Sequence, residues 1–501
     1  MKTVNKWYAL AISTLLYVCL SLIAVNQHRN VNVDDYHSEL WADRSGYYVY
    51  LPMWFNYGMK SDDFPEEAFD PGCGYSKDSI SGLVYTKYPS GVALLAAPFY
   101  VTWQWVKPAS DQYLTQADLR WANFVGCFYA VLGLFLLYVF LIQHFTRWIS
   151  FAVIATIFLS TSLLYYTIIE AFMAHIYGFF LVSALLLFLE TRLAKNNFTW
   201  LHAVVFGLIC GLLVLCRATN VIFLVGILAW FIYRSGQGSQ LLQLNKWPWK
   251  ALITATIAFL ACWIPQFYYW FSLRGSIFID AYQGEHFDFL HPELLLHYFS
   301  PYNGFFLYMP LAALLLVYAL IRIRKYPEFR FFLPTIALAG FVFASWTSWG
   351  FGCSFGQRSY IEVYPIFAFI LGRAITEWFS RSWFTRAITT SVLILFSWNS
   401  FSLSTHYDAC FYGQRWDWQE YFLLCNKSHS WVFKVNAWTM KDDFEGEPFH
   451  FEVGRENLIS NNEAYSGDTV CQILPTTLYG PGAATQLRWL TGSDTLQQLD
   501  Y

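Results

Sequence analysis

Long apolar runs separated by short polar segments make up most of the first 404 residues. A helix that crosses a bilayer needs about 20 mostly apolar residues. The runs that approach this length are Trp7–Val25, Trp121–Gln143, Ile149–Ile169, Phe172–Leu189, Trp200–Cys216, Ala218–Tyr233, Ala251–Phe271, Phe305–Ile321, Phe331–Trp346, Tyr360–Trp378 and Ala387–Ser404. The pattern predicts an all-α polytopic membrane protein with about eleven transmembrane helices.

Two regions depart from this pattern. The first loop, residues 26–120, is too long for a simple connector, and it contains the apolar run Tyr88–Val106, which prolines and glycine interrupt. We expect that run to form a helix in the membrane interface. Residues 405–501 are polar and contain the alternating segment Phe449–Val453, which is typical of a strand. The sequence therefore predicts a transmembrane domain over 1–404 and a small β-rich extension over 405–501, similar in part to a β-sandwich.

The basic residues predict how the helices are oriented. If the N-terminus lies inside, the short inner loops carry most of the Arg and Lys, as cytoplasmic loops do. The only carboxylates near span ends on that side are Glu190, Glu328 and Glu377. The first loop and the C-terminal extension then lie on the outer side.

Composition narrows the class further. The chain is 56% hydrophobic and 13% charged, far from the roughly 25% charged residues of soluble proteins. A net charge of −3 argues against a nucleic-acid partner. The glycine-rich loop that binds ATP phosphates in P-loop proteins is also missing from the sequence. The lipid bilayer is the partner that the composition predicts.

Charged residues at the predicted outer side are the candidates for chemistry. Asp35 and Asp43 follow the first span, Lys87 lies at the end of the first loop, and Arg217 and Arg358 lie at outer ends of spans. An ionisable residue at such a position is a functional candidate, and arginine presents a planar fork suited to phosphate. The alternative is that these basic residues have a structural role, because lysine and arginine at a membrane interface also extend toward lipid headgroups.

Four motifs on this side carry a resemblance to a known family. They are Asp43-Arg-Ser-Gly-Tyr47-Tyr48, Lys87-Tyr88-Pro89-Ser-Gly91, Glu170-Ala-Phe-Met-Ala-His175 and Gly352-Cys-Ser-Phe-Gly356-Gln-Arg358. In this order they resemble the GT-C superfamily of multispan glycosyltransferases, such as protein O-mannosyltransferases and the aminoarabinose transferase of lipid A. The resemblance implies transfer of a sugar from a polyprenyl-phosphate carrier to a hydroxyl of a glycan, lipid or protein acceptor.

The resemblance also implies roles for single residues. Asp43 is the first choice for the catalytic base, Asp35 the second and Asp34 the third. Together with the charge at the span ends, which selects Arg217, the resemblance gives a group of substrate-binding candidates that would hold the donor and acceptor: Lys87, Tyr88, Glu170, His175, Arg217 and Arg358. No cofactor is required, although a divalent cation held by Asp35, Glu170 and His175 is an alternative.

The sequence thus predicts an inverting membrane glycosyltransferase in a bacterial inner membrane, with its site facing the periplasm. Two rivals use the same residues differently. A transporter or flippase of lipid-linked sugars would need the basic residues but no base, and an assembly subunit would need neither. Large, unequal outer loops without an inverted repeat favour the enzyme over a secondary transporter.

Overall fold

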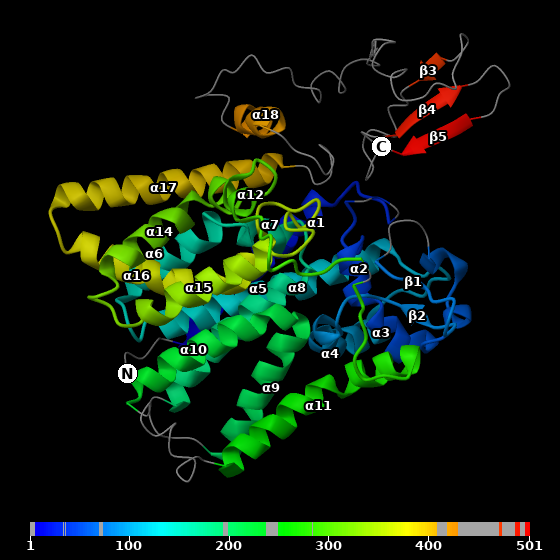
Figure 1. The fold of residues 1–501 in the computed structure, drawn as a ribbon, viewed down its shortest axis with the longest axis horizontal. Helices are drawn as coiled ribbons and strands as arrows, with labels where there is room; N and C mark the ends of the chain where they lie inside the picture. The colour runs from blue at the N-terminus through cyan, green and yellow to red at the C-terminus, as the bar shows by residue number, and fades with distance from the viewer. Residues whose placement is uncertain are drawn as a thin grey trace.

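The computed structural model describes residues 6–33, 35, 37–69, 74–193, 199–236, 249–282, 284–407, 418–428, 470–472, 486–490 and 496–500. These residues are mainly helical, which confirms the predicted all-α class. The long helices are α1 (Lys6–Gln27), α5 (Gln116–Leu141), α6 (Arg147–Leu159), α8 (Ala174–Phe188), α9 (Trp200–Cys216), α10 (Val221–Arg234), α11 (Trp249–Arg274), α14 (Pro310–Arg322), α15 (Phe329–Ala344), α16 (Tyr364–Phe379) and α17 (Trp383–His406). They pack into one bundle (Figure 1).

Shorter elements connect or cover the long helices. They are α2 (Asp43–Tyr48), α3 (Tyr50–Pro52), α4 (Gly91–Val106), α7 (Leu163–Ile168), α12 (Leu294–Phe299), α13 (Phe305–Tyr308), α18 (Trp418–Ser428) and the 3-10 helix η8 (Arg358–Val363). Helix α4 occupies the run expected to be helical in the first loop, and its position in a membrane interface stays a prediction.

Four of the described helices are long and apolar enough to cross a membrane: Gln116–Leu141, Ala174–Arg192, Trp249–Arg274 and Trp383–His406. Six further apolar helices have 10–17 residues. The prediction of about eleven spans is therefore not supported, and two of the predicted runs show why. The run Ile149–Ile169 is broken between α6 and α7, where Thr161 Oγ1 donates back to the carbonyl of Ile157 at 2.7 Å. The run Phe305–Ile321 is broken before Pro310, which disfavours helical backbone at the preceding residue.

Two of the four candidate spans carry most of their apolar side chains on the outside of the bundle. Ile257 and Ile264 of α11 are 64% and 62% exposed, and Ile394 of α17 is 63% exposed. Apolar surface of this extent is rare on soluble monomers. The helices therefore have the surface of a membrane protein.

Small antiparallel sheets occur in the first loop and in the C-terminal region. Strands β1 (Ser76–Lys77) and β2 (Val84–Tyr85) pair in the first loop. Strands β3 (Val470–Gln472), β4 (Gln486–Leu490) and β5 (Leu496–Asp500) form a sheet in the order β3-β4-β5. The alternating segment 449–453 lies outside the described residues.

The bundle has two chemically different ends. The loop end carries the first loop with α2, β1 and β2, and the opposite end lies near the start of α1 (Figure 1). At the opposite end, each of the three carboxylates predicted there forms an ion pair: Glu190 with Arg234, Glu328 with Arg373, and Glu377 with Arg322. The three carboxylates at this end are thus each paired with an arginine.

Candidate active site

Asp43 is held at the loop end by a tight turn and a close backbone contact. It begins α2, directly after Ala42, whose φ of 48° is unusual for a residue with a side chain. Ser45 Oγ accepts a hydrogen bond from the backbone N–H of Gly74 at 2.6 Å. A Cβ on Gly46 would lie 2.2 Å from the ring of Tyr88, so only glycine lets that ring approach α2. Tyr88 is thereby brought next to Asp43.

The Asp43 carboxylate lies among cations and a phenol. Its Oδ1 accepts a short hydrogen bond from the Tyr88 hydroxyl, and its Oδ2 accepts one from Arg358 Nη2 at 2.7 Å. Burial raises the pKa of Asp43, but Arg358, Tyr88 and Lys87 outweigh burial and leave the pKa below its usual value. Asp43 is consequently ionised at neutral pH. Lys87 in turn donates to the Glu285 carboxylate at 2.5 Å.

Phe351 brings the two predicted arginines to the same place. It has a left-handed backbone, with φ of 58°, which is a strained conformation for an aromatic residue. Its ring centroid lies 5.8 Å from the guanidinium carbon of Arg217 and 6.0 Å from that of Arg358. The Nε atom of Arg358 is buried and has no hydrogen-bond partner among the described residues. This donor is therefore available to an incoming acceptor.

Arg217 joins His175 and Glu362 in a buried cluster. Arg217 Nη1 lies 3.0 Å from His175 Nδ1 and 3.6 Å from Glu362 Oε1, and the same His175 nitrogen is 3.2 Å from that oxygen. Room for the glutamate comes from Gly178 on α8, where a Cβ would lie 2.4 Å from Glu362 Cγ. Sequence reasoning missed Glu362. The sequence feature that could have identified Glu362 is its position as a carboxylate inside the apolar run Tyr360–Trp378.

Glu170 lies in the link between α7 and α8 and faces the same charges. Burial raises the pKa of Glu170, while Arg44 and Arg358 oppose the shift. The preceding residue is fixed from two sides, because the carbonyl of Ile169 lies 3.3 Å from Arg44 Nη1 and 3.2 Å from His28 Nε2. The pKa values of Asp43 and Glu170 are thus displaced in opposite directions.

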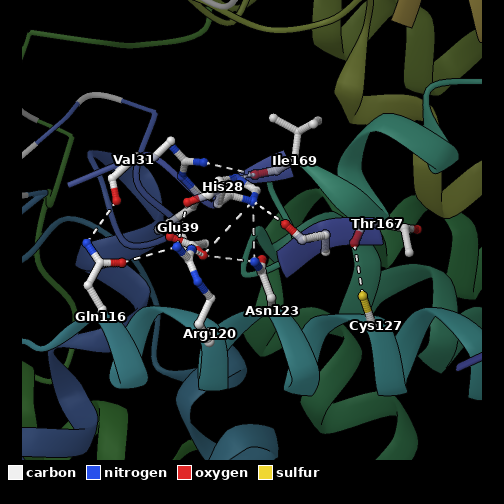
Figure 2. A network of polar contacts seen from close by, with 11 residues as sticks. His28, Val31, Glu39, Gln116, Arg120, Asn123, Cys127, Thr167 and Ile169 are labelled. Carbon is white, nitrogen blue, oxygen red and sulfur yellow. Dashed lines mark hydrogen bonds and ion pairs between the residues drawn. The ribbon is translucent and has the colours of Figure 1, made fainter. Parts of the chain in front are cut away.

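A buried polar network supports this link and the start of the first loop (Figure 2). Glu39 accepts hydrogen bonds from Arg120 and, at 3.0 Å, from Asn123 Nδ2. Arg120 also donates to the backbone carbonyl of His28. The end of α1, the first loop and the start of α5 are therefore joined by side chains that sequence reasoning did not select.

The remaining predicted residues are placed differently. Asp35 accepts hydrogen bonds from the backbone N–H and the ring of its neighbour His37, at 2.8 and 2.9 Å. Within the described ranges, Asp35, Glu170 and His175 do not form a group of metal-binding residues, and no other such group of three is found there. Asp34 lies outside the described residues.

Comparisons with known proteins add no identification, since no family model, curated protein or solved structure matches this chain.

The charged residues at the loop end determine which chemistry the site can support. Lys87, Arg217 and Arg358 are cations, and Glu285, Glu362 and Asp43 are their respective carboxylate partners. Such a cluster can bind an anion through the arginines and can accept a proton through a carboxylate.

Proposed function

We propose that this chain is a membrane glycosyltransferase of the GT-C type. It would transfer a hexose or pentose from a polyprenyl-phosphate carrier to a hydroxyl of a glycan, lipid or protein. The observation that carries the proposal is the Asp43 carboxylate bound to Arg358 at 2.7 Å, with Tyr88 and Lys87 beside it. A potential base and cations suited to a leaving phosphate are thus adjacent.

The reaction needs both functions at once. A base removes the proton of the acceptor hydroxyl, and the oxygen attacks the anomeric carbon from the face opposite the phosphate. The bond between that carbon and the phosphate oxygen breaks, and its electron pair stays on the polyprenyl phosphate. Lys87, Arg217 and Arg358 would stabilise the charge that develops on this leaving group. The anomeric configuration is inverted.

The Asp43–Arg358 ion pair suggests how the donor prepares the base. While Arg358 is bound to Asp43, the carboxylate is a weak base because its pKa is lowered. A donor phosphate that engages Arg358 competes for the same guanidinium donors. Loss of that bond raises the proton affinity of Asp43 at the moment when the leaving group is in place.

Glu170 is the alternative base. Its pKa is raised by burial, which makes the carboxylate a better proton acceptor than an ion-paired aspartate. In that arrangement Asp43 would instead orient Arg358 toward the donor. The two assignments differ in which carboxylate is indispensable for transfer.

We further propose that the loop end faces the periplasm of a bacterial inner membrane. The basic residues predicted on the cytoplasmic side, including Arg234, Arg322 and Lys325, lie at the opposite end of the bundle. Lipid-linked sugars exposed at the outer face would then reach the loop end directly.

Purified protein incubated with a panel of radiolabelled polyprenyl-phosphate sugars and membrane extract tests the proposal. Asp43→Asn keeps the shape and hydrogen bonds but accepts no proton, so transfer should fall by roughly 100-fold or more while donor binding persists. The matched control is Asp111→Asn, an exposed aspartate in the same loop, which should transfer normally. Asp35→Asn and Glu170→Gln complete the ranking of carboxylates.

The same experiment separates the rivals. A flippase that uses this cluster requires no deprotonation and should move donor lipid in vesicles equally well with Asp43→Asn. An assembly subunit should neither bind the donor nor transfer its sugar. Normal transfer by all three carboxylate variants would refute the assignment of the base to this site.

A further inference from the structure

A cavity lies at the opposite end of the bundle, away from Asp43. It has a volume of about 530 Å³ and is bordered by the end of α10, by the middle of α16, by His144 just after α5 and by the residues before α15. Its polar lining consists of Arg234, Arg373, Glu328, His144 and the Tyr233 side chain. The cavity shares no residue with the proposed glycosyl-transfer site.

Arg373 is held so that most of its donors remain unused. Its Nε donates to Glu328 at 2.8 Å, and this is its only hydrogen bond in the part of the chain that the structure describes. The guanidinium carbon lies 5.1 Å from the ring centre of Phe369, 5.2 Å from Tyr326 and 5.6 Å from Phe145. Three aromatic rings therefore surround a cation whose two terminal nitrogens have no protein acceptor there.

Arg234 supplies the other cationic wall. Both of its terminal nitrogens bind Glu190, one of them at 2.9 Å, and Trp230 and Phe231 lie against its guanidinium at 6.0 and 5.8 Å. Glu190 itself is not part of the lining. Glu190 thus neutralises Arg234 from outside the lining, and the donors left for an anion in the cavity are the terminal nitrogens of Arg373.

The helices that border the cavity carry exposed apolar side chains farther along their length. Helix α10 packs against α15, and Val225 and Leu338 on these helices are 61% and 51% exposed. At the cavity itself, Tyr233 is half exposed and its ring lies 5.1 Å from that of Phe331. Tyrosine and tryptophan are enriched at the level of lipid headgroups. An anionic group in the cavity would therefore lie at one end of two helices whose exposed side chains include apolar ones.

We propose that this cavity binds the phosphate of an anionic phospholipid from the leaflet at the opposite end of the bundle. Arg373 donates from its free terminal nitrogens to the phosphate oxygens, and the guanidinium of Arg234, paired with Glu190, forms the facing wall. The acyl chains lie along the exposed face of α10 and α15. Basic pockets between transmembrane helices on the cytoplasmic side are suited to such headgroups.

Native mass spectrometry of the detergent-purified protein tests this binding, with phosphatidylglycerol and phosphatidylcholine as probes. Phosphatidylglycerol should be retained in preference to phosphatidylcholine. The double variant Glu328→Gln/Arg373→Gln removes both partners, so no unpaired buried carboxylate is left behind. Its affinity for phosphatidylglycerol should fall by about tenfold, as expected when charge-assisted hydrogen bonds are lost.

The matched control is Arg324→Gln, because Arg324 is exposed at the same end and is not in the cavity lining. This control should keep its phosphatidylglycerol. Equal retention of both lipids, or full retention by the double variant, would overturn the proposal. If inorganic phosphate alone raises the melting temperature through Arg373 and phosphatidylglycerol does not bind, the phosphate site stands and the lipid source is wrong.

Discussion

The Gly178→Ala substitution perturbs the Glu362 cluster without removing any charged group. The added methyl carbon would lie 2.4 Å from Glu362 Cγ and 3.0 Å from its Oε1, so the glutamate must move. Overpacking of this kind costs about 1–3 kcal/mol. Replacing a helical glycine by alanine in turn stabilises the helix by about 1 kcal/mol, because alanine has the higher helix propensity. The net loss of stability should therefore be about 0–2 kcal/mol, and the protein should remain folded.

The functional effect should be larger than the stability effect. Displacement of Glu362 disturbs the 3.0 Å contact of Arg217 with His175 and the 3.6 Å contact with the glutamate itself. Arg217 would then lose the geometry that directs it toward the donor phosphate in the proposed reaction. One lost charge-assisted hydrogen bond is worth about 1.5 kcal/mol or more, so the donor KM should rise by about tenfold. Initial-rate kinetics at varied donor concentration measure this change.

Gly133→Ala is the matched control for this experiment. Gly133 is on α5, which packs against α8, and its Cβ would lie 2.8 Å from the ring of Phe179. The substitution crowds the same helix interface but leaves Glu362 and Arg217 in place. If both variants raised the donor KM equally, general disturbance of α8 would explain the result. An unchanged donor KM in Gly178→Ala would refute the role given to Glu362 and Arg217.

Three further outcomes follow from the charged residues. Arg358→Lys keeps the charge but loses the planar fork, so donor KM should rise by about tenfold in initial-rate assays; an effect on kcat alone would argue against phosphate binding. As pH is lowered in a profile of kcat/KM, activity should persist to below the usual aspartate pKa if Asp43 is the base, because its pKa is lowered. If Glu170 is the base, activity should already be lost at a pH above the usual glutamate pKa, because the raised pKa lets the carboxylate protonate sooner. Asp78→Asn should lower the free energy of unfolding by about 1–3 kcal/mol, because two hydrogen bonds from Arg274, at 2.6 and 2.7 Å, hold the first loop to α11. The Arg274 contact lowers the pKa of Asp78, so this stabilisation is present above the pKa of the unfolded chain and is lost on acidification; a urea-unfolding midpoint unchanged by acid would contradict it.

Much of the loop end could be predicted because charge is rare in this chain and position restricts it. Asp43, Lys87, Arg217 and Arg358 stand out as charged residues beside apolar runs, and the structure brings them together. Asp35 is closer along the chain to the first span than Asp43, yet it bonds to His37. Proximity to a span therefore did not distinguish a loop aspartate in the cluster from one outside it.

Other features depended on tertiary packing. Glu362 follows Arg358 by four residues but contacts Arg217 and His175, a relation that spacing along the chain does not reveal. The number of spans was overestimated because an apolar run reports burial or lipid contact, whereas helix continuity depends on local backbone. The interruption before Pro310 is an example, since the surrounding side chains are apolar and only the proline marks the break.

The pairing of charges at the loop end bears on how a donor would be recognised. Lys87, Arg217 and Arg358 each have a carboxylate partner in the absence of substrate, so none is an isolated buried cation. A donor phosphate must therefore compete with carboxylates that are already in place, and it gains most where a guanidinium donor is still unused. Arg358 meets this condition, because its Nε is unpartnered in the described structure while Nη2 is bound to Asp43. A phosphate that first engages Nε can then draw Nη2 away from Asp43, which would couple donor binding to release of the proposed base.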